Sequence, residues 1–413
     1  MTEQAKVPAI RFAGFTDPWE QRKLENLASF GGGHTPSMAD ASNYVDGKIL
    51  WVTSQDVKQH YIENTTTMIS EKGAATLTLY PSDSIVIVAR SGILRHTIPV
   101  AKLRKPATVN QDIKVIQTVD SCDSSWLLQY FIASNKTLLR EYGKTGTTVE
   151  SIDFAKMKST ALMVPYIEEQ QAIGSFFSRL DNLITLHQRK YDKLVIFKKS
   201  MLEKLFPKDG ESVPEIRFAG FTDPWEQRKL ENLASFGGGH TPSMADASNY
   251  VDGKILWVTS QDVKQHYIEN TTTMISEKGA ATLTLYPSDS IVIVARSGIL
   301  RHTIPVAKLR KPATVNQDIK VIQTVDSCDS SWLLQYFIAS NKTLLREYGK
   351  TGTTVESIDF AKMKSTALMV PYIEEQQAIG SFFSRLDNLI TLHQRKLELL
   401  QNIKKSLLDK MFV

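Results

Sequence analysis

Several features that would quickly narrow the function of this chain are scarce or missing. The 413 residues include two cysteines, Cys122 and Cys328, and eight histidines, and none of these form a cluster with zinc-site spacing. A single cysteine in each half of a chain is typical of a small buried side chain. No run of about 18 apolar residues occurs, so we expect no membrane span. The N-terminal MTEQAKVPAI lacks the basic and apolar regions of a secretory signal, which favours a cytoplasmic protein.

Catalytic signatures are missing as well. In YGKTGTT (142–148), the Gly-Lys-Thr of a phosphate-binding loop is present, but Leu138 stands where the loop needs its first glycine. FGGGH (30–34) is glycine-rich without a βαβ pattern after it. The Asn-Pro-Pro-Tyr or Asp-Pro-Pro-Tyr tetrapeptide of adenine methyltransferases does not occur, nor does a nuclease-like Asp followed by Glu-x-Lys after Pro81. We therefore predict a binding protein with no catalytic or metal site of its own.

What the sequence does contain is a long perfect repeat. Residues 10–190 recur without a change as residues 216–396, an offset of 206 positions (216 − 10). Folding does not demand such identity, because cores accept many substitutions of similar volume. The duplication is therefore recent, homogenised or made in the laboratory, and in each case the chain carries two copies of one device.

The net charge of +5 conceals a basic segment in each copy. Between positions 90 and 114, a single carboxylate, Asp112, opposes Arg90, Arg95, Lys102, Arg104, Lys105 and Lys114. The rest of the chain must then be net acidic. Clustering of this kind is what a polyanion-binding surface needs, although a solvated basic face would give the same pattern.

Each copy begins with a mixed region and ends with a long helix. Enrichment in β-branched residues predicts strands at 49–54, 84–90, 97–102 and 113–119. A helix is predicted over 124–143, with a serine cap at its start and a glycine at its end. The predicted fold class is α+β, with globular α/β domains at 1–164 and 207–370 and helical regions at 165–206 and 371–413.

The helical regions carry a heptad seam, in which apolar residues recur in steps of four and three. In the first copy the seam is Ile173, Phe177, Leu180, Ile184, His187, Tyr191, Leu194, Lys198, Met201 and Leu205. In the second it is Ile379, Phe383, Leu386, Ile390, His393, Leu397, Leu400, Lys404, Leu407 and Met411. A helix of about 40 residues is roughly 60 Å long and needs a partner along its seam. Because residues 206–215 lead from the first helix straight into the second domain, we expect the helices to pair as an antiparallel coiled coil with approximate twofold symmetry.

An ordered set of motifs in each copy resembles the specificity subunits of Type I restriction–modification enzymes. In the first copy the motifs are GGGHTPS (31–37), GKILWVTSQDV (47–57), ARSGILR (89–95), TVNQDI (108–113), GTTVESID (146–153) and VPYIEEQQAIGSFFSRLDNLI (164–184). Each motif alone is weak, but their order is specific and extends over essentially the whole chain.

The resemblance implies a non-catalytic subunit that recognises double-stranded DNA. Two target-recognition domains would each read one half of a bipartite site, and the coiled coil would fix their separation and dock two methyltransferase (M) subunits. S-adenosylmethionine and adenine-N6 methylation would belong to those partners, and restriction (R) subunits would add the nuclease. Family members usually carry two different recognition domains, whereas here the two are identical. Self-association of the isolated chain stays open.

Side chains that can reach phosphates or base edges are the candidates for the DNA-binding surface. In the first copy we predict Thr35, Ser54, Gln55, Arg90, Arg95, Gln111 and Lys144. The corresponding residues of the second copy are Thr241, Ser260, Gln261, Arg296, Arg301, Gln317 and Lys350. Asn110 offers a further amide, but it could equally cap a loop, and Thr35 could merely shape a turn.

Two other interpretations fit the same sequence. The chain could be a coiled-coil scaffold with two identical ligand-binding domains that do not bind DNA, or an enzyme whose site is not recognisable. Affinity for random duplex that falls steeply with salt would exclude the scaffold. Activity with S-adenosylmethionine and DNA in the absence of any partner would indicate the enzyme.

Overall fold

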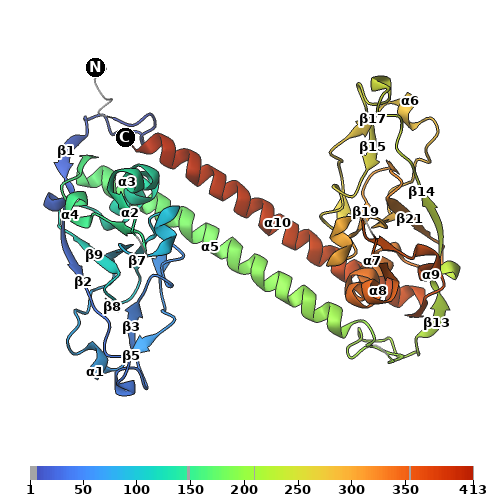
Figure 1. The fold of residues 1–413 in the computed structure, drawn as a ribbon, viewed down its shortest axis with the longest axis horizontal. Helices are drawn as coiled ribbons and strands as arrows, with labels where there is room; N and C mark the ends of the chain where they lie inside the picture. Colours follow the sequence, from blue (N-terminus) through green and yellow to red (C-terminus); the bar gives the residue numbers. More distant parts are fainter. Residues whose placement is uncertain (1–6, 147–148, 209, 353–354, 413) are drawn as a thin grey trace. The chain divides into compact units, whose positions relative to one another are not determined.

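The computed structural model describes residues 7–146, 149–208, 210–352 and 355–412. The chain forms two compact units, one made of residues 1–188 with 395–413 and the other of residues 189–394. Each unit contains one globular domain together with a part of each long helix (Figure 1). Among the described residues, none of the helices has a stretch apolar enough to cross a membrane.

The first domain is built from short strands, short helices and 3-10 turns (η). In chain order its elements are β1 Glu20–Lys23, η1 Leu24–Asn26, β2 Ala28–Gly32, η2 Ala41–Asn43, β3 Ile49–Val52, β4 Tyr61–Ile62, β5 Met68–Ile69, α1 Glu71–Ala74, β6 Ile85–Val88, η3 Gly92–Arg95, β7 Val100–Leu103, β8 Ala107–Val109, β9 Ile113–Thr118, α2 Ser124–Ala133, α3 Asn135–Tyr142, β10 Gly143–Lys144, β11 Ser151–Ile152, α4 Phe154–Met157 and β12 Ala161–Val164. The strands form a five-stranded sheet of order β2-β9-β6-β7-β4, a three-stranded sheet of order β5-β3-β8, and the pairs β1-β12 and β10-β11.

The second domain repeats these elements and the same sheet orders. They are β13 Glu226–Lys229, η4 Leu230–Asn232, β14 Ala234–Gly238, η5 Ala247–Asn249, β15 Ile255–Val258, β16 Tyr267–Ile268, β17 Met274–Ile275, α6 Glu277–Ala280, β18 Ile291–Val294, η6 Gly298–Arg301, β19 Val306–Leu309, β20 Ala313–Val315, β21 Ile319–Thr324, α7 Ser330–Ala339, α8 Asn341–Tyr348, β22 Gly349–Lys350, β23 Ser357–Ile358, α9 Phe360–Lys364 and β24 Ala367–Val370.

The central strand β6 explains why the larger sheet is covered on both faces. Its four residues, Ile-Val-Ile-Val, are all fully buried. Ile85 and Ile87 enter the cluster that contains Trp126 of α2, whereas Val86 and Val88 enter a second cluster with residues of β3 and β8. Because successive strand residues point to opposite faces, an unbroken apolar run is what a doubly covered strand requires.

The four predicted strands are confirmed as β3, β6, β7 and β9, but the predicted helix over 124–143 was wrong in two details. Its cap is Asp123, whose Oδ1 accepts a hydrogen bond from the Trp126 amide at 2.8 Å. The helix also breaks at Ser134 into α2 and α3. The next residue, Asn135, bonds to both the amide and the carbonyl of Ile98, so a contact with the neighbouring loop sets the break.

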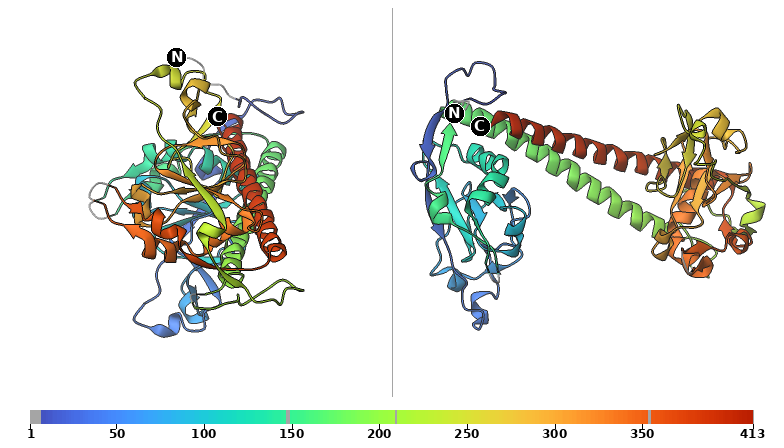
Figure 2. Two further views of the ribbon diagram at one scale, coloured as in Figure 1. Left: turned by 90° about the vertical axis from the view of Figure 1, so that its right-hand side faces the viewer. Right: turned by 45° about the horizontal axis from the view of Figure 1, so that its top comes forward.

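The long helices are α5 Ile167–Lys204 and α10 Ile373–Met411. The N-terminal part of α5 and the C-terminal end of α10 lie side by side at the first domain (Figure 1 and Figure 2). There, Lys404 pairs with Asp181, and Phe412 packs near Phe177 with ring centroids 6.3 Å apart. Later residues of α10 thus contact earlier residues of α5, which confirms the antiparallel pairing.

The second unit makes the same contacts with the helices exchanged. Lys198 of α5 pairs with Asp387 of α10 at 2.6 Å, and Phe206 stacks near Phe383 at 6.3 Å. All predicted seam positions are buried or half-buried. The seam prediction is therefore confirmed, including its two lysines, which sit at 8% and 7% exposure because each meets a buried carboxylate.

Candidate nucleic-acid interface

Three of the seven predicted site residues of the first copy follow the ends of two parallel strands. Val52 at the end of β3 is paired with Val109 at the end of β8, and the amide of Asn110 donates to the Val52 carbonyl at 3.0 Å. Ser54 and Gln55 follow β3 after Thr53, and Gln111 follows β8 after Asn110. Because parallel strands end at one edge of their sheet, these three residues emerge at the same place.

Thr35 joins this edge through the loop that follows β2. Its Oγ1 donates to Oε1 of Gln111 at 2.5 Å. The loop can come this close because position 33 is glycine: a Cβ there would lie 1.8 Å from the Val109 carbonyl oxygen. The glycine-rich motif therefore serves backbone packing against β8.

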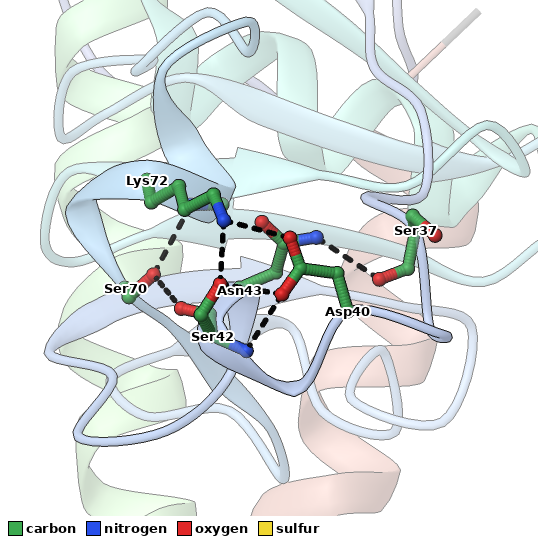
Figure 3. Close-up of polar contacts among 7 residues, drawn as sticks. Ser37, Asp40, Ser42, Asn43, Ser70 and Lys72 are labelled. Carbon is green, nitrogen blue, oxygen red and sulfur yellow. Dashed lines mark hydrogen bonds and ion pairs between the residues drawn. The ribbon is translucent and has the colours of Figure 1, made fainter.

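A polar cluster fixes the rest of this loop in place (Figure 3). Lys72 donates to Oδ2 of Asp40 and to Oγ of Ser42, each at 2.7 Å, which joins α1 to η2. The side-chain amide of Asn43 donates to the Ser37 carbonyl at 2.9 Å. Hydrogen bonds from Lys72 and Ser42 lower the pKa of Asp40 to about 2. The loop that presents Thr35 is thus tied down two residues beyond it, at Ser37.

Arg90 connects the same edge to the hairpin β10-β11. It directly follows Ala89, whose amide donates to the Asp112 carbonyl at 2.7 Å, and it forms a β-bridge with Ser151. Its guanidinium Nε lies 3.4 Å from Oδ1 of Asp112. Arg90 therefore stands between the loop of Gln111 on one side and β11 on the other.

Arg95 and Lys144 pair with the two carboxylates that flank β11 in the sequence, Glu150 and Asp153. Arg95 ends the turn η3 and donates from Nε to Oε1 of Glu150 at 2.5 Å. Lys144 is paired with Ser151 in the hairpin and places its Nζ 2.9 Å from Oδ2 of Asp153. These cations hold the pKa of Glu150 and of Asp153 below their usual values. The side chains of the three cations remain 60–65% exposed, so they are held in place without being covered.

The second domain repeats this arrangement. Thr241 donates to Gln317 at 2.6 Å, Lys350 lies 2.8 Å from Asp359, and Arg301 pairs with Glu356. Arg296 lies 2.9 Å from Asp318, closer than its counterpart Arg90 lies to Asp112. Ser260 and Gln261 follow β15 as Ser54 and Gln55 follow β3. In each domain these contacts connect the loop after the parallel strands with the neighbouring hairpin, through Arg90 in the first domain and Arg296 in the second.

Two sequence-based expectations about this surface were wrong. Lys102 does not belong to it, since the residue is 6% exposed and its Nζ bonds to Ser124 and Ser125. Arg104 stacks on the Tyr61 ring at 4.0 Å and faces α5. The basic segment is thus divided between two sides of the domain. Arg90 and Arg95 follow β6, whereas Lys102 and Arg104 are two residues apart at the end of β7 and so share the face that meets α2 and α5.

Asn110 is also no reader of DNA in this arrangement. It is 7% exposed, and its Oδ1 accepts from the Asp112 amide at 3.1 Å, so it caps its own loop. The sequence analysis missed the carboxylates Glu150 and Asp153, which hold the cations. The motif GTTVESID contains both, and its two threonines at 147 and 148 lie outside the described residues.

Comparison with known proteins identifies the family. The family of Type I restriction modification DNA specificity domains matches residues 16–195 and again residues 222–402. The chain is 30% identical to the EcoR124I/EcoR124II specificity subunit of Escherichia coli over 186 residues, which is 42% of this chain and 46% of that protein. It is 26% identical to the MjaIX specificity subunit of Methanocaldococcus jannaschii over 416 residues, 95% of this chain and 92% of the relative.

The fold has a solved counterpart. The crystal structure of the Type I restriction–modification S subunit from M. genitalium superposes with a TM-score of 0.68 at 13% identity, over 98% of this chain and 99% of that one. The family match and the curated relatives confirm the resemblance inferred from the motifs. The chain belongs to the Type I restriction–modification DNA specificity family and is a DNA-recognition subunit of such a system.

Proposed function

We propose that this subunit binds a palindromic bipartite DNA site, in which each domain reads one half. The observation that carries the proposal is the repetition of the same polar edge, with the same contacts, in both domains. Identical surfaces bind identical half-sites, and a duplex offers two identical half-sites when its sequence is palindromic. The unread spacer between them is set by the paired helices.

The predicted edge residues divide the work of recognition. The exposed cations Arg90, Arg95 and Lys144 supply charge toward phosphates, and the arginine forks also suit base edges. Gln111, held by Thr35, offers a side-chain amide whose nitrogen is free to donate, since the amide oxygen accepts the threonine hydroxyl. Ser54 and Gln55 add neutral donors and acceptors that discriminate between bases without raising affinity for all DNA.

Catalysis belongs to partners in this proposal. Two methyltransferase subunits carry S-adenosylmethionine and methylate adenine N6, and restriction subunits join them, all in the cytoplasm. The helices offer two equal docking faces, because Leu183 and Leu186 on α5 and their copies Leu389 and Leu392 on α10 are all about half exposed. Equal faces bind two copies of one partner.

Substituting Leu183 and Leu186 with aspartate should leave one methyltransferase subunit per chain, as measured by native mass spectrometry.

Methylome sequencing tests the palindrome. The chain is expressed with its methyltransferase subunits in a host that lacks other systems, and the methylated motif is determined. The expected motif has two half-sites that are reverse complements of each other. Two unlike half-sites would contradict the proposal.

In a companion variant, one heptad is inserted into each helix after positions 190 and 396. The spacer should change while the half-site letters stay the same, and altered letters would refute the separation of reading from spacing.

A further inference from the structure

The arginine at the end of η3 is held by only one of its nitrogens. Nε of Arg95 donates to Oε1 of Glu150 at 2.5 Å, and within the described residues the two terminal amino groups make no other protein contact. The side chain of Arg95 is 65% exposed, whereas that of Glu150 is 10% exposed. A guanidinium fixed at Nε presents Nη1 and Nη2 as a forked pair of donors.

Glu150 itself is a rigid support. Its main-chain carbonyl accepts a hydrogen bond from the amide of Ser91, just before η3, at 3.0 Å. Two residues further along, the amide of Ile152 donates to the Ala89 carbonyl at 2.9 Å. Leu94 anchors the turn in the core at 4% exposure. Glu150 therefore holds the turn by its main chain and the arginine by its side chain. Its second oxygen, Oε2, is buried and has no hydrogen-bond partner among the residues that the structure describes.

The same arrangement occurs around Arg301 and Glu356 in the second domain, where Oε2 of Glu356 is likewise buried without a partner in the described part of the chain. Arg90 resembles Arg95 in being held at Nε, but its distance to the carboxylate is 3.4 Å in one copy and 2.9 Å in the other. The tighter and more buried pair is the one with Glu150.

We propose that Glu150 and Glu356 are positioning residues that aim Arg95 and Arg301 at a guanine in each half-site. Guanine presents O6 and N7 as two adjacent acceptors in the major groove, which match a forked pair of donors. An arginine held in this orientation before binding loses less side-chain entropy on contact. The inference rests on the proposed DNA function and adds to it the identity of one recognised base.

The test uses the full-length chain, with its methyltransferase subunits where these co-purify. A duplex library with randomised positions is selected for binding, and each guanine of the selected half-site is then replaced by 7-deazaguanine, which lacks the N7 acceptor. At one guanine per half-site, this replacement should weaken binding by about 10- to 100-fold. Inosine, which lacks only the minor-groove amino group, should be tolerated at that position.

Glu150→Gln with Glu356→Gln should reduce the 7-deazaguanine effect to less than about 3-fold, while affinity for random duplex stays equal or rises because a negative charge is lost. Asp153→Asn with Asp359→Asn is the matched control. It releases a lysine, which cannot form a fork, so the 7-deazaguanine effect should remain.

The possible failures are distinguishable. If no duplex is enriched over random DNA, the proposed function fails. If the selected half-site lacks guanine, or if the glutamine variant loses affinity equally for all duplexes, Glu150 is a structural residue and only this inference fails. An unchanged 7-deazaguanine effect in the glutamine variant also overturns it.

Discussion

The two units contain the same domain, but the segment before the domain is joined to a long helix in different ways. In the second unit, the main-chain carbonyl of Lys204 at the end of α5 accepts a hydrogen bond from the Ile216 amide at 3.0 Å, and residues 205–215 connect the two covalently. In the first unit, the main-chain carbonyl of Lys410 at the end of α10 accepts the corresponding bond from the Ile10 amide, also at 3.0 Å. Here the two residues are 400 positions apart in the sequence (410 − 10). The contact is thus specified by the packed side chains and does not require chain continuity.

The comparison extends to the residues that accompany this bond. Arg11 forms a bidentate pair with Glu169, which also accepts from the Trp19 indole, and Arg217 does the same with Glu375 and Trp225. The carboxylate is 2% exposed in both units. A buried carboxylate with three donors is a strong local anchor, which explains why the segments around Arg11 and Arg217 make the same contacts.

The helix ends show which positions matter. Phe206 and Phe412 both enter the aromatic core of their units, and Lys198 and Lys404 both meet a buried aspartate. Outside the seam the letters diverge: Val195, Ile196 and Phe197 correspond to Gln401, Asn402 and Ile403. The inner positions thus keep the same contacts in both units, while the outer face of α5 carries exposed apolar residues such as Ile196, which is 69% exposed.

The largest expected effect comes from removing one partner of the buried helix pair. Asp181 accepts from Lys404, Gln129 and Tyr61, so Asp181→Leu should cost about 3–5 kcal/mol of unfolding free energy by leaving Lys404 buried and unpaired. Asp387→Leu should cost about the same in the second unit. Urea unfolding measures both.

The double variant Asp181→Leu with Lys404→Met should regain most of the loss, because a buried pair can be replaced by apolar residues of similar volume. A double variant as unstable as the single one would mean that the carboxylate acts mainly through Gln129 and Tyr61. Unequal losses in the two units would break the equivalence of the halves.

The next largest effect compares the segment around Arg11 with the equivalent segment around Arg217, which is linked directly to α5. Arg11→Ala should remove hydrogen bonds to a charged group worth about 1.5–3 kcal/mol and release the N-terminal segment. Limited trypsin digestion should then cut faster near Arg22 than in wild type. Arg217→Ala removes the same bonds but leaves its segment tied to α5, so cutting near Arg228 should rise less. Equal rates would show that the covalent linker adds nothing.

Much of this architecture could be predicted because it rests on local or periodic signals. The strand predicted at 84–90 contains an unbroken β-branched run at 85–88, and the seam of α5 and α10 repeats over several heptads. The break at Ser134 could not be predicted, since it depends on a contact between Asn135 and Ile98 across 37 residues. Burial of Lys102 was hidden for a similar reason: its partners Ser124 and Ser125 lie on a helix that packs over the sheet.

The candidate site was predictable in its cations but not in their supports. Arginine, lysine and glutamine near glycine-rich loops stand out as nucleic-acid binders, and contacts do link Thr35 to Gln111 and Arg90 to the same loop. That these residues bind DNA stays a prediction. Glu150 is 55 residues from Arg95, and no spacing rule links them. Only the fold of the hairpin β10-β11 beside η3 brings the two together.

A one-sided variant sharpens the comparison at the DNA surface. Arg90→Ala with Arg296 intact should relax recognition in one half-site only, by about 1–3 kcal/mol if the arginine reads a base. The methylated motif should then become asymmetric, with one degenerate position. Affinity lost equally for every sequence would instead identify Arg90 as a phosphate contact, and its salt dependence should fall by about one unit of slope. Arg296→Ala alone should give the mirror-image motif.

The smallest effect concerns acid sensitivity at the polar cluster of Figure 3. Asp40 and Asp246 both have a pKa of about 2, lowered by the ammonium of Lys72 or Lys278 and by the neighbouring serine. A carboxyl whose pKa is lowered by folding stabilises the fold at pH above its unfolded value near 3.9, and that contribution is lost as the pH falls toward 2. Asp40→Asn with Asp246→Asn should therefore leave stability less dependent on pH between about 4 and 2, as measured by urea unfolding at each pH. Since the two clusters are identical, each single variant should account for half of the change, and a change confined to one of them would show that the two loops differ in solution despite their equal contacts.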